Sequence, residues 1–346
     1  MIRFECDYSE GAHPKVLARL METNLEQTQT YGEDEYCLDA AQRIKEICLC
    51  PEAEVHFFTG GTQTNLTLIS AALRPHQGVI SADIGHINVH ESGAVEATGH
   101  KVLHLAGQNG KLTAAQIQKA CVDHFGDVTH EHMVQPGLVY ISNPTEIGSL
   151  YSRSELTAIR AACSQNHLYL YMDGARLGYA LCARGNDVDL PAIAELCDAF
   201  YIGGTKNGAL FGEALVICRE ELKADFRYIM KQKGALLAKG RLLGLQFQAL
   251  FEDDLYFEIA RYANAMAMLI KEACERKGFN FLISSCTNQQ FPILPVKLLE
   301  KLSEDFTYSF WQKIDDSHSA VRFCTSWATT EAQVRQLTER IENYEE

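Results

Sequence analysis

An aspartate and a lysine stand at the ends of two strand-like runs in the middle of the chain. Residues 168–172 (LYLYM) are apolar and aromatic, as expected for a strand covered on both faces, and Asp173 follows them directly. Residues 199–202 (AFYI) form a second such run ahead of Lys206, and residues 190–197 between the two runs read as an amphipathic helix. This is the spacing of one βαβ unit. Asp173 and Lys206 should therefore project from the carboxyl ends of parallel strands, where open α/β sheets bind ligands.

These two side chains together suit one cofactor chemistry. A lysine amine forms a Schiff base with the aldehyde of pyridoxal 5'-phosphate (PLP), and a carboxylate keeps the pyridine nitrogen of PLP protonated, which makes the ring an electron sink. Each residue alone has an ordinary explanation, since a strand-end lysine is usually a solvated charge and a strand-end aspartate usually caps a turn or a helix. The pair therefore predicts PLP only if the chain also offers a site for the phosphate.

A candidate phosphate site occurs earlier in the chain. Residues 55–58 read as a strand, residues 59–65 (TGGTQTN) as a small polar turn, and residues 66–73 as a helix. Free backbone N–H groups at the start of a helix bind phosphate, and glycines let the anion approach, which makes Gly61 and Thr62 cofactor-binding candidates. A helix cap without a ligand is the alternative explanation. The turn has neither the P-loop spacing nor the GxGxxG pattern.

Taken together, these residues resemble the threonine aldolase and β-eliminating lyase family of fold type I (aspartate-aminotransferase-like) PLP enzymes. The resemblance runs in order along nearly the whole chain and rests on these segments: GGTQTN at 60–65, His86 with ESGA at 91–94, DGARL at 173–177, GGTK ending at Lys206, and VR at 321–322. It implies an α/β protein with a three-layer large domain around a mainly parallel sheet and a smaller α+β C-terminal domain.

Length and composition agree with a two-domain enzyme. The chain has 346 residues, of which 47% are hydrophobic and 22% charged. The alternation of strands and helices gives way near residue 250 to a helix, short strands and a helix. We therefore expect an N-terminal arm at 1–15, a large PLP-binding domain at 16–249 and a small domain at 250–346.

Charge and cysteine usage bear on partners and location. A net charge of −14 argues against nucleic acid or an anionic membrane as a general partner. No apolar run reaches transmembrane length, and the first residues lack the features of a signal peptide. The twelve cysteines are scattered, mostly in apolar runs, as buried thiols are in a reducing compartment. We therefore expect a cytoplasmic protein, and no metal site is predicted.

The resemblance also assigns catalytic roles. Lys206 would carry the cofactor, and His86 would lie on the ring face, orient it and exchange protons with the substrate near neutral pH. The better-known threonine aldolases have a histidine near the position of Glu146. Glu146 could replace that histidine as a base, provided that burial or a like charge raises its pKa, or it could indicate a different reaction.

Four further residues are candidates for binding cofactor or substrate. Arg322 stands in the middle of a strand, where a charge is costly unless it is paired. An arginine fork suits a carboxylate, so the α-carboxylate of an amino acid would be its partner, with an internal salt bridge as the alternative. Arg176 would contact the cofactor and the same carboxylate. Tyr31 would approach the active site of a neighbouring subunit, and Lys239 would reach the partner's phosphate; a packing aromatic and a solvated charge are their alternative explanations.

The predicted function is retro-aldol cleavage of a β-hydroxy-α-amino acid to glycine and an aldehyde, as in a low-specificity L-threonine aldolase. The predicted assembly is a homodimer or homotetramer with shared active sites. The same architecture performs β-elimination and transamination on other amino acids, so these reactions stay open. A third possibility is a non-catalytic α/β protein that binds a phosphorylated metabolite through Gly61 and Thr62.

Overall fold

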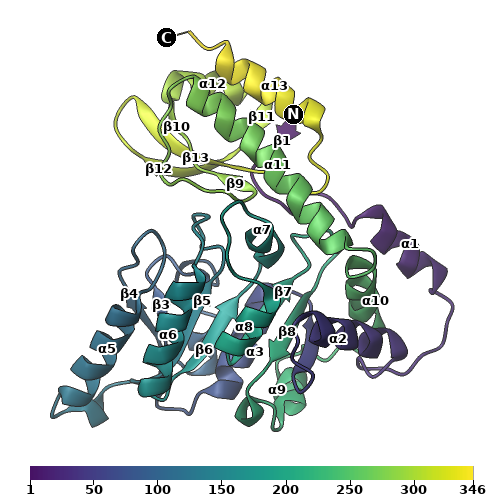
Figure 1. The fold of residues 1–346 in the computed structure, drawn as a ribbon, viewed down its shortest axis with the longest axis vertical. Helices are drawn as coiled ribbons and strands as arrows, with labels where there is room; N and C mark the ends of the chain where they lie inside the picture. The colour runs from purple at the N-terminus through teal and green to yellow at the C-terminus, as the bar shows by residue number, and fades with distance from the viewer. Residues whose placement is uncertain (346) are drawn as a thin grey trace.

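The computed structural model describes residues 1–345, and a mixed sheet of seven strands forms the centre of this part of the chain (Figure 1). The strands are, in spatial order, β2 (Glu54–Phe58), β8 (Glu213–Ile217), β7 (Ala199–Gly203), β6 (Tyr169–Asp173), β5 (Gln135–Ser142), β3 (Gln77–Ala82) and β4 (Val102–Leu105). Within this sheet, β8 runs in the direction opposite to that of the other six strands. The predicted α/β fold class with a mainly parallel sheet is confirmed.

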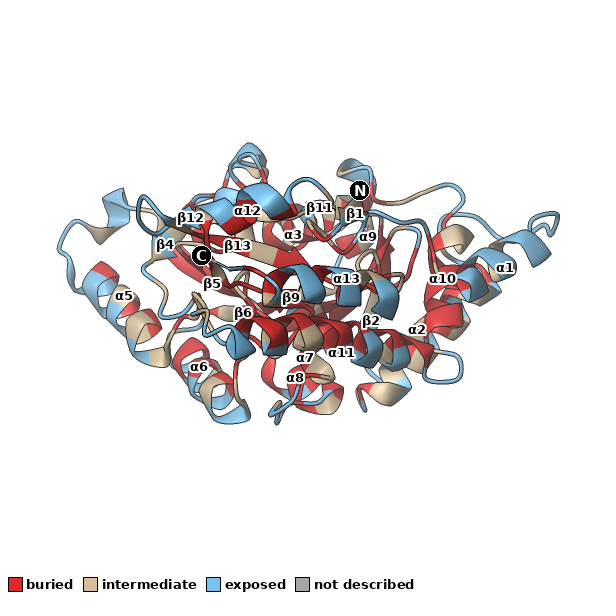
Figure 2. Cartoon of the chain, turned by 90° about the horizontal axis from the view of Figure 1, so that it is seen from above, coloured by how far each residue is buried: buried red, intermediate tan, exposed pale blue. Residues whose placement is uncertain are grey.

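Helices cover both faces of the sheet and make the predicted three layers (Figure 1). One face packs on α2 (Glu35–Ile47), α5 (Ala114–Gly126), α6 (Arg153–Gln165), α8 (Leu190–Leu196) and α10 (Arg241–Leu250), and the other on α3 (Gly61–Ala72) and α9 (Phe226–Gln232). Side chains alternate between these layers with the period of two of a strand. In β5, Val139 and Ile141 face the first layer, whereas Leu138 and Tyr140 face the second. Both faces of the sheet are therefore buried (Figure 2).

The predicted smaller C-terminal α+β domain is also present. Three helices, α11 (Leu255–Arg276), α12 (Val296–Leu302) and α13 (Glu331–Glu342), pack on a small antiparallel sheet. That sheet contains β10 (Ile293–Pro295), β13 (His318–Cys324) and β12 (Ser309–Lys313), and β9 (Gln289–Gln290) pairs with the end of β13. The helix α11 runs from the small domain down to the large sheet (Figure 1).

The N-terminal segment joins the C-terminal part of the molecule. The strand β1 (Ile2–Arg3) pairs in parallel with β11 (Phe306–Thr307), and Phe4 is fully buried in the core of the small domain. The chain then runs across to α1 (Pro14–Glu22) beside the large sheet. The boundaries 1–15, 16–249 and 250–346 stay a prediction.

Two other expectations concern cysteines and membranes. All twelve cysteines are free thiols in the structure. Of the helices in residues 1–345, not one combines the length and apolar character needed to cross a bilayer. The His130–His132 turn lies on the surface of the large domain, and no cluster of metal-ligating side chains was found within the described residues.

Candidate active site

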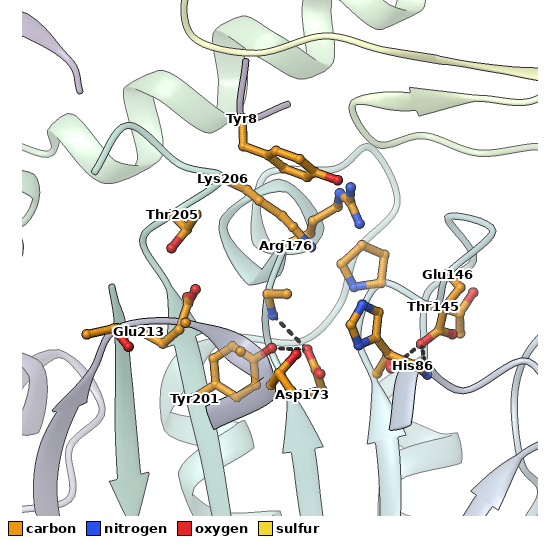
Figure 3. Close-up of a pocket in the computed structure, with 17 residues that line it drawn as sticks. Tyr8, His86, Thr145, Glu146, Asp173, Arg176, Tyr201, Thr205, Lys206 and Glu213 are labelled. Atoms are coloured by element: carbon orange, nitrogen blue, oxygen red, sulfur yellow. Dashed lines mark hydrogen bonds between the residues drawn. The ribbon is translucent and has the colours of Figure 1, made fainter. Parts of the chain in front are cut away.

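A cavity of about 290 Å³ opens at the carboxyl ends of β5, β6 and β7 (Figure 3). The predicted site residues that line it are Gly61, Thr62, His86, Glu146, Asp173, Arg176 and Lys206. The cavity lies where the sequence analysis expected it, because continuous apolar runs end at this edge of the sheet. Asp173 and Lys206, which are distant in sequence, thus reach the same small space.

Asp173 is the most strongly held acid of the cavity. It is the last residue of β6, and its carboxylate accepts hydrogen bonds from Tyr140 Oη (2.6 Å), Tyr201 Oη (2.5 Å), Asn65 Nδ2 (3.1 Å) and the backbone N–H of Ala175 (2.9 Å). Burial raises the pKa of the carboxyl, but the neighbouring His86 and these hydrogen bonds outweigh burial and hold the pKa below its ordinary value. Asp173 therefore stays ionised.

The two phenols reach Asp173 because of strand periodicity. Tyr140 in β5 and Tyr201 in β7 both face the layer of α3, on the two strands beside β6. Burial and the nearby Asp173 raise the pKa of both phenols well above the ordinary value, so both remain donors. These tyrosines were not predicted as site residues, although their place in the buried runs is a usable signal.

Lys206 lies in the turn after β7 and has an unusual electrostatic environment. Burial lowers the pKa of its amine, and the neighbouring Arg176 lowers it further, whereas Asp7, Asp173 and Glu213 act in the opposite direction. A lysine with a lowered pKa is more often in the neutral, nucleophilic form at neutral pH. Its nitrogen lies 5.9 Å from the ring centroid of Tyr8, which forms another wall of the cavity.

His86 is positioned by a buried acid. The short helix α4 (His86–Val89) begins at this residue, and the Nδ1 atom lies 2.8 Å from Glu91 Oε1. The side chain of Glu91 is fully buried, and an imidazole that donates from Nδ1 to this carboxyl group turns its other nitrogen, Nε2, away from Glu91. Asn65 Nδ2 bridges Glu91 (2.7 Å) and Asp173. His86 and Asp173 are thus tied into one network.

Glu146 is tied to the same histidine through the backbone. Its Oε1 atom accepts hydrogen bonds from Ser142 Oγ (2.7 Å) and from the backbone N–H of His86 (2.9 Å). Burial raises the pKa of this carboxyl and the nearby Asp173 adds to the rise, in spite of the two hydrogen bonds. The condition that the sequence analysis set for Glu146 as a base is therefore met; its role stays a prediction.

The start of α3 offers backbone donors to the cavity. Its N-cap, Gly60, makes no side-chain cap hydrogen bond, and Gly61 and Thr62 line the cavity. A Cβ atom at Gly61 would lie 2.9 Å from Tyr201 Oη, so this position has no room for a larger residue. Uncapped N–H groups on a helix of this length bind an anion such as phosphate.

Arg176 lies at the cavity and is held by an acid that the sequence analysis did not select. Its Nε and Nη2 atoms donate to the two oxygens of Asp7 at 2.7 and 2.9 Å. Asp7 is fully buried and also accepts from Asn288 Nδ2 at 2.9 Å. Burial raises the pKa of Asp7, but Arg176 and Lys206 outweigh that effect and lower it.

Three predicted residues do not line this cavity. Tyr31 and the exposed Lys239 lie near α10, and Tyr31 packs under Lys231 at 4.5 Å from the ring centroid. Arg322 lies in β13 and donates to the backbone oxygen of Glu5, Ser309 Oγ and Gln289 Oε1. No carboxylate within residues 1–345 pairs with Arg322, so the internal salt bridge considered from the sequence is not present.

A buried acid, Glu213, is the remaining unpredicted feature. It begins β8, lines the cavity and accepts a hydrogen bond from the backbone N–H of Gly204 at 3.0 Å. Burial raises the pKa of Glu213 to about 8, although Thr205 and Lys206 act in the opposite direction. The signal was an acid at the start of an otherwise apolar run, a placement that costs free energy unless a partner or proton compensates it.

Comparison with solved structures identifies the class of protein. The chain superposes on a double mutant of aspartate aminotransferase from Thermus thermophilus with a TM-score of 0.72, at 14% identity, over 99% of this chain and 91% of that chain. At this identity the likeness concerns the fold alone. The fold is therefore that of the aspartate-aminotransferase-like enzymes.

Comparison by sequence identifies the family. The β-eliminating lyase family matches residues 7–294, and the chain belongs to this family. It is 32% identical to a low specificity L-threonine aldolase from a Pseudomonas species, over 98% of this chain and 96% of that protein. It is also 46% identical to the solved threonine aldolase of Leishmania major, with a TM-score of 0.96 over 99% of both chains. The predicted family and the prediction of a lyase are confirmed.

Proposed function

We propose that the protein is a PLP-dependent aldehyde-lyase that cleaves a β-hydroxy-α-amino acid such as L-threonine to glycine and an aldehyde. The observation that carries this proposal is that Lys206, Asp173 and the start of α3 share one cavity. The names of the relatives that match the full length support the aldol reaction.

The residues of the cavity fit the cofactor. Gly61 and Thr62 would bind the phosphate through backbone N–H groups, Lys206 would hold the aldehyde carbon, and the ionised Asp173 would hold the protonated ring nitrogen. Asp173 already has four donors and a carboxylate offers about four lone-pair sites, so the ring nitrogen would replace one of the present donors. When bound, PLP supplies an electron sink for the bond that breaks at Cα.

Substrate recognition and proton transfer fall to other side chains. Arg176 and Arg322 would bind the α-carboxylate, since a guanidinium pairs with a carboxylate through two hydrogen bonds. Nε2 of His86 would take the proton of the β-hydroxyl group as the Cα–Cβ bond breaks, with Glu146 as the second candidate base. Both candidate bases lie at the same wall of the cavity, where the backbone N–H of His86 donates a hydrogen bond to the carboxylate of Glu146 (Figure 3).

Product analysis tests the reaction. The purified protein loaded with PLP should release acetaldehyde and glycine from L-threonine or L-allo-threonine. The second candidate, β-elimination, is favoured by the family match and would give 2-oxobutyrate from threonine and pyruvate from serine. Oxo acids without aldehyde would overturn the aldol proposal. A protein that gains no near-visible absorbance with PLP would indicate the non-catalytic alternative.

We also propose a homo-oligomer with shared sites. Tyr31 and Lys239 lie outside the cavity of their own chain, so their predicted roles need a second copy. Apolar side chains are exposed at this end of the molecule, namely Leu17, Met21, Leu25 and Leu38. Light scattering should give at least a dimer. Mixed subunits carrying Lys206→Ala and Lys239→Ala should recover part of the activity that each variant lacks, whereas a monomer would exclude this arrangement.

A cytoplasmic location stays a prediction, which the unpaired thiols support.

A further inference from the structure

A short N-terminal segment, residues 5–8, contacts the cationic side chains at and near the cavity. The backbone oxygen of Glu5 accepts from Arg322 Nη2 at 2.8 Å, and the Tyr8 ring lies over Lys206. Between them, Asp7 pairs with Arg176. This segment is therefore part of the site, although it is far from the rest of the site in sequence.

The pair of Asp7 and Arg176 has a geometry that leaves one edge of the guanidinium open. A guanidinium has five N–H groups, and Asp7 takes those on the side edge, at Nε and one hydrogen of Nη2. No partner within residues 1–345 accepts from Nη1. The open end edge can bind a second carboxylate through two hydrogen bonds, and Arg176 lies at the cavity wall.

Asp7 is itself fixed from two sides. Its Oδ2 atom accepts from both Arg176 Nε and Asn288 Nδ2, and its side chain is completely excluded from solvent. Asn288 belongs to the small domain, where it also donates to the backbone oxygen of Thr325. The position of the Asp7 carboxylate is therefore set by the packing of the N-terminal segment against the small domain, and it sets the orientation of Arg176.

We infer that Asp7 is a positioning residue, which holds Arg176 with its open edge toward the α-carboxylate of the substrate. This inference rests on the proposed function, because it needs a substrate with an α-carboxylate. A purely structural role, in which Asp7 only neutralises a buried arginine, predicts a loss of stability and no change in substrate binding. The two roles are therefore separable by experiment.

The test compares Asp7→Asn with wild type in the PLP-loaded enzyme. In the asparagine variant, an NH2 group replaces one of the two carboxylate oxygens that accept hydrogen bonds from Arg176. Two donor groups then face each other, so the guanidinium should rotate out of its present orientation. KM for L-threonine should rise roughly tenfold or more while kcat changes by less than about threefold, as expected for the loss of one charge-assisted contact in binding. Asp7→Glu keeps the charge but shifts it by one methylene, and should raise KM less than Asp7→Asn.

Two controls make the result specific. Arg3→Ala removes an exposed ion pair with Glu5 in the same segment and should leave KM unchanged. In an Arg176→Gln background, Asp7→Asn should add no further increase in KM, because residues that act through one another are not additive. An additive increase would contradict the proposed route through Arg176.

A second measurement does not depend on turnover. 3-Hydroxybutyrate has the carboxylate and the hydroxyl group of threonine but no amino group, so its binding can be followed by calorimetry on the protein. Asp7→Asn should weaken this binding by the same factor as it raises KM. Wild-type KM and wild-type binding, with only a lower melting temperature, would overturn the inference. If Asp7→Asn does not fold, wild-type KM and binding in Asp7→Glu would overturn it.

These readouts also separate this inference from the proposed function. If wild type releases no aldehyde, the aldolase proposal fails, while the binding of 3-hydroxybutyrate still tests Asp7. If wild type is an aldolase and Asp7→Asn leaves KM and this binding unchanged, only the inference about Asp7 fails.

Discussion

Replacing Glu213 by glutamine should change how the stability of the cofactor-free protein depends on pH. Burial raises the pKa of Glu213 to about 8 in the folded chain, against 4.5 for an ordinary glutamate. Between these values the folded state keeps a proton that the unfolded state releases. The stability that this bound proton contributes is therefore complete below the pKa of Glu213 in the unfolded chain. It is lost as the pH rises through the pKa of Glu213 in the folded chain.

The size of the effect follows from proton linkage. One proton difference changes the free energy of unfolding by about 1.4 kcal/mol per pH unit, so Glu213 should cost wild type about 2 kcal/mol between pH 6 and pH 8. Glu213→Gln is neutral at every pH and keeps an oxygen for the N–H of Gly204, so it should lack this loss. The variant should therefore gain relative to wild type as the pH rises.

Urea denaturation at pH 6, 7 and 8 measures this difference. The neighbouring Lys206 titrates with the opposite sign, since burial lowers the pKa of its amine, so the comparison is repeated in a Lys206→Met background. There the opposing positive charge is absent, and the gain from Glu213→Gln should persist or increase. Parallel pH profiles for the paired proteins in both backgrounds would refute the claim that Glu213 holds a proton near neutral pH.

Three further variants test the proposed roles directly. His86→Asn should lower kcat about a hundredfold, the usual contribution of a positioned base, with little change in KM in steady-state assays. Glu146→Gln should keep more activity than His86→Asn and should retain the acidic limb of the pH profile of kcat/KM. Loss of that limb would identify Glu146 as the base, because the raised pKa of Glu146 would then control the profile. Arg322→Lys should raise KM for threonine roughly tenfold, since an ammonium cannot form the paired contact, and an unchanged KM would exclude Arg322 from carboxylate binding.

The sheet and the centre of the site could be predicted because their signals are local. Continuous apolar runs locate the buried strands, and the residues that follow such runs must meet at one edge of a parallel sheet. Asp173, Lys206 and the turn before α3 were found in this way. The contribution of Asp7 has no local signal, because it lies 169 residues from Arg176 and depends on how the N-terminal segment crosses the molecule.

Residues that would serve the active site of a neighbouring subunit are harder to predict from the sequence. The sequence placed Tyr31 and Lys239 at the site through the family resemblance, but neither lines the cavity of its own chain. A sequence carries no signal for which copy a side chain will serve, since that depends on the surfaces that meet in the assembly. Arg322 illustrates a related point. Its position in a strand indicated a partner, yet its described hydrogen-bond partners are neutral, and its guanidinium lies over the ring of Trp311, 5.6 Å from the centroid.

The buried acids at and near the cavity fall into two groups, one with a lowered pKa and one with a raised pKa, according to the cations and hydrogen-bond donors that surround each of them. Asp7 and Asp173 are buried, but cations and hydrogen bonds lower the pKa of both, so they remain ionised and can hold a guanidinium or a protonated ring. Glu146 and Glu213 lie at the same cavity with fewer compensating groups, and burial raises the pKa of both. Groups whose environments separate their pKa values in this way take different tasks in catalysis. Proton exchange in the cavity should therefore involve the glutamates or His86, whereas the two aspartates fix geometry and charge.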